Sequence, residues 1–188
     1  MKTKGLDNRQ RIVEAANMLF YRQGFNQTSF SEIADQANIP RGNFYYYFKS
    51  KDDILAAVIE DRIQRIRPML TEWDTQYTNP KDRLHRFLAI LLNSEADLVR
   101  YGCPIGSLSV ELSKTQLAMQ SKARDMFDVF VEWLIPQFAA LGHKADARLL
   151  AMRLLAKGQG VSLIGNAYAD AAFLHAEIAD LNNWIDQL

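Results

Sequence analysis

Residues 28–51 read Thr-Ser-Phe-Ser-Glu-Ile-Ala-Asp-Gln-Ala-Asn-Ile-Pro-Arg-Gly-Asn-Phe-Tyr-Tyr-Tyr-Phe-Lys-Ser-Lys, and this stretch decides the fold of the chain. Ser29 precedes Glu32 by three positions, which is the spacing of a capping box at the start of a helix. Asn38 tolerates a left-handed backbone and is expected to end that helix, while Pro40 suits the turn or the start of a second helix. A helix, a sharp turn and a second helix are the layout of a helix-turn-helix, whose second helix lies in the major groove of DNA.

The second predicted helix, over about residues 41–48, separates an inward face from an outward one. Phe44 and Phe48 are expected to point inward. Gly42 on the opposite face permits close approach to base edges, and the Asn43 amide suits an adenine edge. The flanking tyrosines and lysines suit phosphate contacts. The candidate DNA contacts are Thr28, Ser29, Arg41, Gly42, Asn43, Tyr45, Tyr46, Tyr47, Lys49 and Lys51. An isolated aromatic cluster is usually core, but the capped preceding helix, the short turn and the lysines favour DNA here.

The distribution of charge supports this interpretation. The net charge of the 188 residues is zero, yet residues 1–51 carry 8 Lys and Arg against 4 Asp and Glu. The remaining residues carry 14 against 18. The basic end coincides with the predicted helix-turn-helix, as the electrostatic footprint of a nucleic-acid binder does. Lys2 and Lys4 form either a basic arm that reaches the phosphates or a disordered start of the chain.

The first 60 or so residues resemble the DNA-binding domain of the TetR family of transcriptional regulators. The matching segments are Arg9–Ala16, Leu19-Phe20, Gln23-Gly24-Phe25, Thr28-Ser29, Ile33-Ala34, Gly42–Phe48 and Ser50-Lys51-Asp52. The resemblance implies an all-α, nine-helix architecture, with a helix-turn-helix domain over 1–50 and a helical ligand-binding and dimerisation domain over 51–188. Positions 43, 46 and 47 depart from the residues common in that family, so the operator sequence stays open.

Composition narrows the class of protein. Hydrophobic residues make up 48%, which is typical of a globular chain. No apolar run reaches the length of a membrane span, and no signal-peptide pattern opens the sequence. The single cysteine excludes an internal disulfide and fits a cytoplasmic location. We therefore expect a cytoplasmic regulator without a cofactor.

Helical periodicity continues through the rest of the chain. Before the motif, a helix is expected over about 7–23, and after it one that Pro68 kinks or interrupts. Further helices are expected over about 81–99, 105–113, from 115, over 145–169 and over 173–187.

A TetR-like regulator binds a two-fold operator as a dimer, and the family pairs its last two helices with those of the partner. Three glycines within eight residues, Gly158, Gly160 and Gly165, suggest the close approach of another helix. The candidate interface residues are Gly158, Val161, Gly165, Leu174, Ile178 and Leu181. The alternative is that these faces pack only within one chain.

The resemblance also implies a cavity for a small-molecule inducer in the C-terminal region. The candidate lining residues are Trp73, Tyr77, Phe87, Leu91, Cys103, Ile105, Leu108, Phe127, Phe130 and Trp133. For any single one of these aromatic and aliphatic residues, ordinary core packing is the alternative.

Cys103 has a second interpretation. Pro104 places the thiol at the N-terminus of a short helix, where the helix dipole stabilises a thiolate. The stretch from Gly102 is similar to a Gly-Cys-x-x-Gly motif in a TetR subgroup that includes sensors of reactive electrophiles, except that Pro104 replaces the usual leucine. The hypothesis is that Cys103 senses oxidants or electrophiles, and the alternative is a small buried residue.

These features predict a repressor that leaves a palindromic double-stranded DNA operator when it binds a small molecule or reacts with an electrophile. The two recognition helices of the dimer must lie about 34 Å apart. An enzyme is disfavoured, because His85, His143 and His175 lack metal-ligand spacing and no nucleophile elbow or phosphate loop occurs. A helical adaptor that binds protein does not explain the basic N-terminal end.

Overall fold

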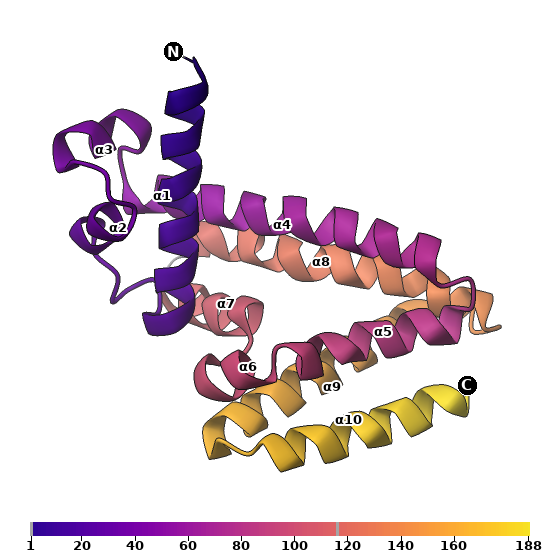
Figure 1. The fold of residues 1–188 in the computed structure, drawn as a ribbon. Helices are drawn as coiled ribbons and strands as arrows, with labels where there is room; N and C mark the ends of the chain where they lie inside the picture. Colours follow the sequence, from indigo (N-terminus) through magenta and orange to yellow (C-terminus); the bar gives the residue numbers. More distant parts are fainter. Residues whose placement is uncertain (1, 116) are drawn as a thin grey trace. The chain divides into compact units, whose positions relative to one another are not determined.

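The computed structural model describes residues 2–115 and 117–188, except for the side chains of residues 2–7, 41, 115, 117 and 118 (Figure 1). These residues form helices, turns and loops and contain no β-strand, so the expected all-α fold is confirmed. The helices are α1 (Lys2–Gln23), α2 (Phe30–Gln36), α3 (Arg41–Tyr47), α4 (Lys51–Gln76), α5 (Pro80–Asn93), α6 (Glu95–Tyr101), α7 (Pro104–Thr115), α8 (Leu117–Ala140), α9 (Ala147–Tyr168) and α10 (Ala171–Asp186).

The helix expected over 81–99 is interrupted at Ser94. The backbone there has φ −113° and ψ 18°, outside the helical region, and the Ser94 N–H still donates to the Ile90 carbonyl. The chain then resumes as α6. Counted as one interrupted helix, α5 and α6 bring the described segments to the expected nine.

Pro68 does not interrupt α4, which continues through it to Gln76. A proline removes one N–H donor from the helical ladder and frees the carbonyl four residues earlier. That carbonyl belongs to Gln64, which is exposed like Pro68 itself, so solvent replaces the lost donor.

The chain divides into two compact units, Met1–Gln64 with Ser107–Met126, and Arg65–Gly106 with Phe127–Leu188. In the first unit, α1, α2, α3 and the start of α4 bury apolar side chains. Among the most deeply buried are Ile12, Phe25, Ile33, Phe44 and Ile54, each at most 1% exposed. The predicted DNA-reading helix, α3, packs against this core.

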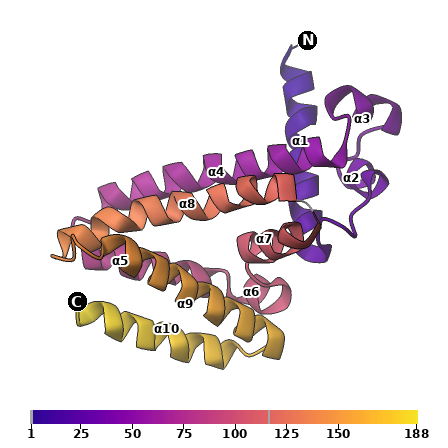
Figure 2. The same ribbon diagram turned by 180° about the vertical axis from the view of Figure 1, so that it is seen from behind.

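In the second unit, α5, α9 and α10 lie side by side in both views (Figures 1 and 2). Polar links join the helices of this unit. The Asn166 amide of α9 donates to the Val99 carbonyl of α6 at 2.9 Å. The His85 ring of α5 meets Asn182 and Asp186 of α10 at 2.7 and 2.9 Å.

None of the helices described here is long and apolar enough to cross a membrane.

Candidate nucleic-acid interface and effector region

The turn of the helix-turn-helix is built by local hydrogen bonds. The Glu32 N–H donates to Ser29 Oγ at 3.2 Å, and the Ser29 N–H donates to Glu32 Oε2 at 2.7 Å, which confirms the predicted capping box. Asn38 adopts φ 52°, the left-handed backbone expected at the end of α2. The bond from the Ser29 backbone, followed by those from its hydroxyl and from Gln23, holds the pKa of Glu32 below its usual range.

Helix α3 presents the expected outward face. Phe44 and Phe48 are 1% and 3% exposed and fix the helix to the core. Gly42 and Asn43 are exposed, and Tyr46 is 80% exposed. No atom lies within 4 Å of the position that a Cβ on Gly42 would occupy, so this face is open. Arg41 begins α3, but its side chain lies outside the described residues.

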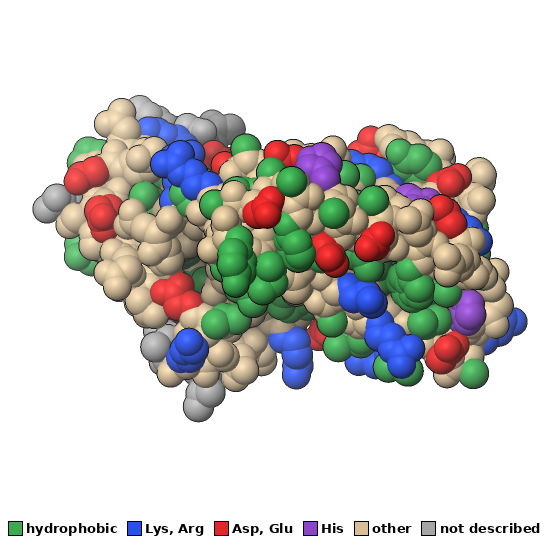
Figure 3. Space-filling view, turned by 90° about the horizontal axis from the view of Figure 1, so that it is seen from below, with side chains coloured by type: hydrophobic (Ala, Val, Ile, Leu, Met, Phe, Trp, Pro, Cys, Tyr) green, Lys and Arg blue, Asp and Glu red, His purple; other side chains and the backbone are tan. Residues whose placement is uncertain are grey.

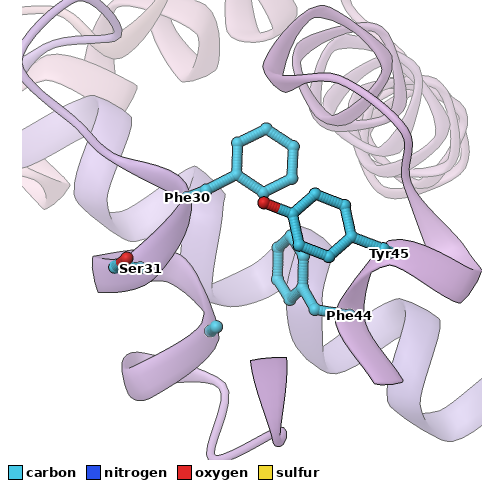
Figure 4. A pocket seen from close by; sticks show the side chains of 5 residues that line it. Phe30, Ser31, Phe44 and Tyr45 are labelled. Carbon is cyan, nitrogen blue, oxygen red and sulfur yellow. The ribbon is translucent and has the colours of Figure 1, made fainter. Parts of the chain in front are cut away.

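A small hollow lies between α2 and α3 (Figure 4). Its lining residues are Phe30, Ser31, Ala34, Phe44 and Tyr45. The Tyr45 ring stacks on Phe30, with ring centroids 5.6 Å apart and planes 12° apart. Phe30 in turn meets the buried Phe44 edge to face at 5.2 Å. Tyr45 is therefore 56% exposed and yet held against the core.

Two of the residues expected to contact DNA make hydrogen bonds within the protein itself. Thr28 is 1% exposed, and its hydroxyl donates to the Gly24 carbonyl at 2.7 Å. The Lys51 ammonium donates to the carbonyls of Phe25, Asn26 and Thr28 at 2.9, 3.3 and 2.9 Å. An ammonium has three donors, so all of them are used in holding the α1–α2 loop. The structure gives both residues a packing role, which the sequence does not reveal.

The other flanking residues are closer to the surface. The Lys49 ammonium is exposed and donates to the Tyr45 carbonyl at 2.6 Å. The Tyr47 hydroxyl accepts from the Asn8 amide at 3.3 Å and is partly buried. The side chains that remain outward are thus those of Ser29, Asn43, Tyr45, Tyr46 and Lys49.

Helix α7 contributes a residue to the same unit that sequence reasoning does not identify. Glu111 Oε2 accepts from the Phe25 N–H at 2.9 Å, and Oε1 accepts from the Asn26 N–H at 2.7 Å. A Cβ on Gly24 would lie 3.2 Å from the same carboxylate. One carboxylate thus fastens α7 to the loop that precedes the helix-turn-helix.

This motif has counterparts among known proteins. A family model described as bacterial regulatory proteins, tetR family, matches residues 12–58, which contain α2, α3 and the turn. The HTH-type transcriptional repressor DhaR from Mycobacterium sp. (strain GP1) is 26% identical over 165 residues, which are 82% of this chain and 80% of that protein. The chain belongs to the TetR family.

Solved TetR-family structures share the whole fold. A TetR transcriptional regulator from Legionella pneumophila has a TM-score of 0.80 at 27% identity and covers 94% of each chain. Another, from Chloroflexus aurantiacus, has a TM-score of 0.85 at 23% identity and covers 100% of this chain and 98% of its own. The matched proteins are transcriptional regulators rather than enzymes, and this TetR-family chain is likewise a helix-turn-helix transcriptional regulator.

The residues expected to line an effector cavity are partly brought together in the second unit of this TetR-family chain. Trp73 of α4 meets Trp133 of α8 edge to face at 5.7 Å, and Phe87 of α5 meets Phe130 of α8 at 5.6 Å. Ile105 is buried, and Tyr77, Leu91, Cys103 and Phe127 are half-buried. Leu108 is also buried but belongs to the first unit. The four paired aromatics form a cluster on α4, α5 and α8.

Cys103 lies directly before α7 and is half-buried. The Gly106 N–H donates to its Sγ at 3.4 Å, and the Gln159 amide of α9 lies 3.5 Å from the same sulfur. Two N–H donors, the Gly106 backbone and the Gln159 side chain, are therefore directed at the thiol.

The expected dimer contacts lie on the inward face of α9 and α10. Val161, Leu174, Ile178 and Leu181 are at most 6% exposed within one chain, and Gly158 and Gly165 are buried too. Gly165 accommodates Leu174 of the same chain, 3.5 Å from the position of a Cβ. The side available to a second copy is the opposite one, where the exposed apolar residues are Leu149, Met152, Leu163 and Ile164. Figure 3 shows the face that lies below in Figure 1, where exposed hydrophobic side chains alternate with charged ones.

Proposed function

We propose that this TetR-family regulator is a cytoplasmic repressor that binds a palindromic DNA operator as a homodimer and leaves it when an effector binds. The outward face of α3 carries this proposal. Asn43 and Tyr46 are exposed on a helix whose other face is locked into the core, and Gly42 keeps the approach open. Such a face suits direct reading of base edges in the major groove.

Groups at the edges of the outward face of α3 make the phosphate contacts. Lys49 supplies a positive charge, and Tyr45 supplies a hydroxyl on a ring held by Phe30. We therefore retain Ser29, Gly42, Asn43, Tyr45, Tyr46, Tyr47, Lys49 and Arg41 as DNA contacts and assign DNA reading to residues 1–50.

The outer face of α9 supplies the dimer contact. Leu163 and Leu149 are 66% and 51% exposed, although both are large and apolar. Gly160, on the same side, has no atom within 4 Å of a Cβ position, which leaves room for a close helix. Exposed apolar side chains that follow one side of a helix favour an interface. A two-fold axis through this face places two copies of α9 and α10 in a four-helix bundle and assigns dimerisation to the 51–188 region.

Charge on the two helices agrees with such a bundle. Exposed Arg148, Arg153 and Lys157 lie on α9, while Asp180 and Asp186 lie exposed on α10. Packing α9 of one copy against α10 of the other brings opposite charges together.

The effector acts by population shift between a dimer whose recognition helices fit successive major grooves and one in which they do not. Helix α4 begins directly after the helix-turn-helix and ends beside the aromatic cluster, so it contains residues of both units. A ligand that prefers one orientation of α4 therefore changes the affinity for DNA.

Cys103 supports a second form of the same signal, in which an electrophile modifies the thiol and weakens DNA binding. The two N–H donors at Sγ favour this form, as does the similarity of Gly102–Gly106 to the motif of electrophile sensors. Operator binding of wild type and Cys103→Ser is measured before and after treatment with a quinone. Loss of binding in wild type alone is the expected result, and equal responses of the two proteins exclude the thiol as sensor.

The function itself is tested by a gel shift with a labelled duplex from the region upstream of the protein's own gene. The expected result, at a fixed and stated salt concentration, is a complex that survives excess scrambled duplex and contains two protein chains. A complex that scrambled duplex removes as readily as the unlabelled operator contradicts sequence-specific binding.

A further inference from the structure

Arg86 of α5 is a cation in an unusual position within the second unit. Its Nη1 atom is buried and has no hydrogen-bond partner among the described residues. Its guanidinium carbon lies 4.4 Å from the centre of the Trp73 ring. A buried N–H of a charged group normally has an acceptor, because leaving it without one is costly.

Arg83, one turn earlier on the same helix, shows how an arginine is satisfied in this unit. It donates to the Tyr77 carbonyl at 2.8 Å, to the Asp74 carbonyl at 3.0 Å and to the Gln137 amide oxygen at 3.1 Å. Its Nε also lies 3.4 Å from the Asp74 carboxylate. That carboxylate accepts in addition from the Trp133 indole at 3.1 Å, so it is already shared by two donors. Arg83 therefore has acceptors for its N–H groups, whereas Arg86 Nη1 has none among the described residues.

The surroundings of Arg86 are aromatic. Trp73 beneath the guanidinium is 2% exposed and meets Trp133 edge to face. Phe87, the next residue on α5, meets Phe130, which lies one turn before Trp133 on α8. A guanidinium beside aromatic rings matches a flat apolar ring that carries a carboxylate, because the ring packs on aromatics and the carboxylate takes two parallel N–H bonds.

We propose that Arg86 anchors the effector of this regulator and that the effector is an aromatic carboxylate. This inference rests on the proposed function, since it names the chemistry of the molecule that releases the repressor. The carboxylate supplies the acceptor that Nη1 lacks, and the ring of the ligand packs against the Trp73–Trp133 pair. A neutral amide of the same shape cannot pair with the cation and binds more weakly.

The test measures ligand binding to the full-length protein without DNA. The probes are benzoate, salicylate and 2-naphthoate, each compared with its neutral amide. Trp184→Phe removes the one tryptophan outside the Trp73–Trp133 pair, so the fluorescence of that variant reports on the pair. We expect saturable quenching by at least one carboxylate and binding of its amide that is weaker by about tenfold or more, as loss of a charge-assisted pair implies.

The variants separate a ligand anchor from a structural residue. Arg86→Met keeps the length and apolar stem of the side chain, and Arg67→Met removes an exposed arginine of α4 as the matched control. Arg86→Met is expected to fold with an unchanged or higher melting temperature, because a buried N–H group without an acceptor is removed. It is also expected to bind the carboxylate at least about tenfold more weakly, while its affinity for the amide stays the same.

Three results overturn the proposal: no carboxylate binds wild type at millimolar concentration, Arg86→Met binds it as well as wild type does, or Arg86→Met melts well below the control. The third result assigns Arg86 to the fold, and Arg86→Lys then shows whether the charge alone restores stability. Binding is read without DNA, so its failure leaves operator binding by the ligand-free protein intact. A failure of operator binding, in turn, does not affect the fluorescence result.

Discussion

Replacing Glu111 by alanine is expected to loosen the DNA-binding unit. The Glu111 carboxylate accepts from two backbone N–H groups, those of Phe25 at 2.9 Å and Asn26 at 2.7 Å. Hydrogen bonds to a charged group stabilise by about 1.5–3 kcal/mol each when buried. The Phe25 bond is partly buried, whereas the Asn26 bond is exposed and water replaces much of it. The expected loss is therefore about 2 kcal/mol rather than the sum of two buried bonds.

Thermal and urea unfolding measure this loss. For a chain of this size, 1 kcal/mol corresponds to about 2–4 °C, so Glu111→Ala is expected to melt about 4–8 °C lower than wild type. Glu111→Gln keeps one carbonyl acceptor but turns an amide donor toward the second N–H, and it is expected to fall between the two. Glu132→Ala, which removes an exposed carboxylate from α8, is the matched control. A melting temperature for Glu111→Ala within the range of that control refutes the argument that this carboxylate holds the loop.

Three further predictions use the same unit and the dimer face. Leu163→Glu with Leu149→Glu places charge on the exposed face of α9 and is expected to give a monomer in analytical ultracentrifugation, with operator affinity lost together with the dimer. Lys51→Met removes three hydrogen bonds to carbonyls and is expected to lower the free energy of unfolding by about 1–3 kcal/mol. Lys49→Met is expected to leave that free energy nearly unchanged and to reduce the slope of log K for DNA binding against log salt concentration by about one. The pKa of Glu32 is lowered on folding, so its contribution to stability is complete above the ordinary glutamate pKa and is lost as the pH falls through the lowered value. Urea unfolding of wild type at several pH values is expected to show this fall in the free energy of unfolding, and Glu32→Gln is expected not to show it.

The local chemistry of the helix-turn-helix was predictable because neighbours in the sequence determine it. The Ser29–Glu32 capping box and the left-handed Asn38 depend on residues within one turn of the chain. The inward position of Phe44 and Phe48 follows from helical spacing alone. None of these features requires knowledge of distant segments.

The roles of Lys51 and Glu111 were not predictable from spacing. Lys51 finds its carbonyl partners more than 20 residues away, and Glu111 finds its amides 85 and 86 positions away. A surface-like charge in the sequence acquires a fixed partner only once the fold brings the α1–α2 loop beside it. The prediction that Lys51 contacts a phosphate did not take its hydrogen bonds to this loop into account.

The dimer face shows a different limit of prediction from the sequence. Helix α9 carries apolar residues on two sides, Val161 and Gly165 on one and Leu149 and Leu163 on the other. Periodicity identifies both stripes but does not say which one packs within the chain. Burial decides this point, since the inward stripe is already covered by α10 and the outward stripe is exposed.

The reading of DNA by the outward face of α3 is tested most directly by the specificity of Asn43→Ala. The affinities of wild type and variant for the operator and for scrambled duplex are measured by fluorescence anisotropy at one salt concentration. Loss of a bidentate base contact is worth about 1–3 kcal/mol, so the operator affinity of the variant is expected to fall about tenfold or more while its affinity for scrambled duplex is unchanged. Equal operator affinities of wild type and Asn43→Ala, with Tyr46→Ala also unaffected, contradict the assignment of this face to DNA.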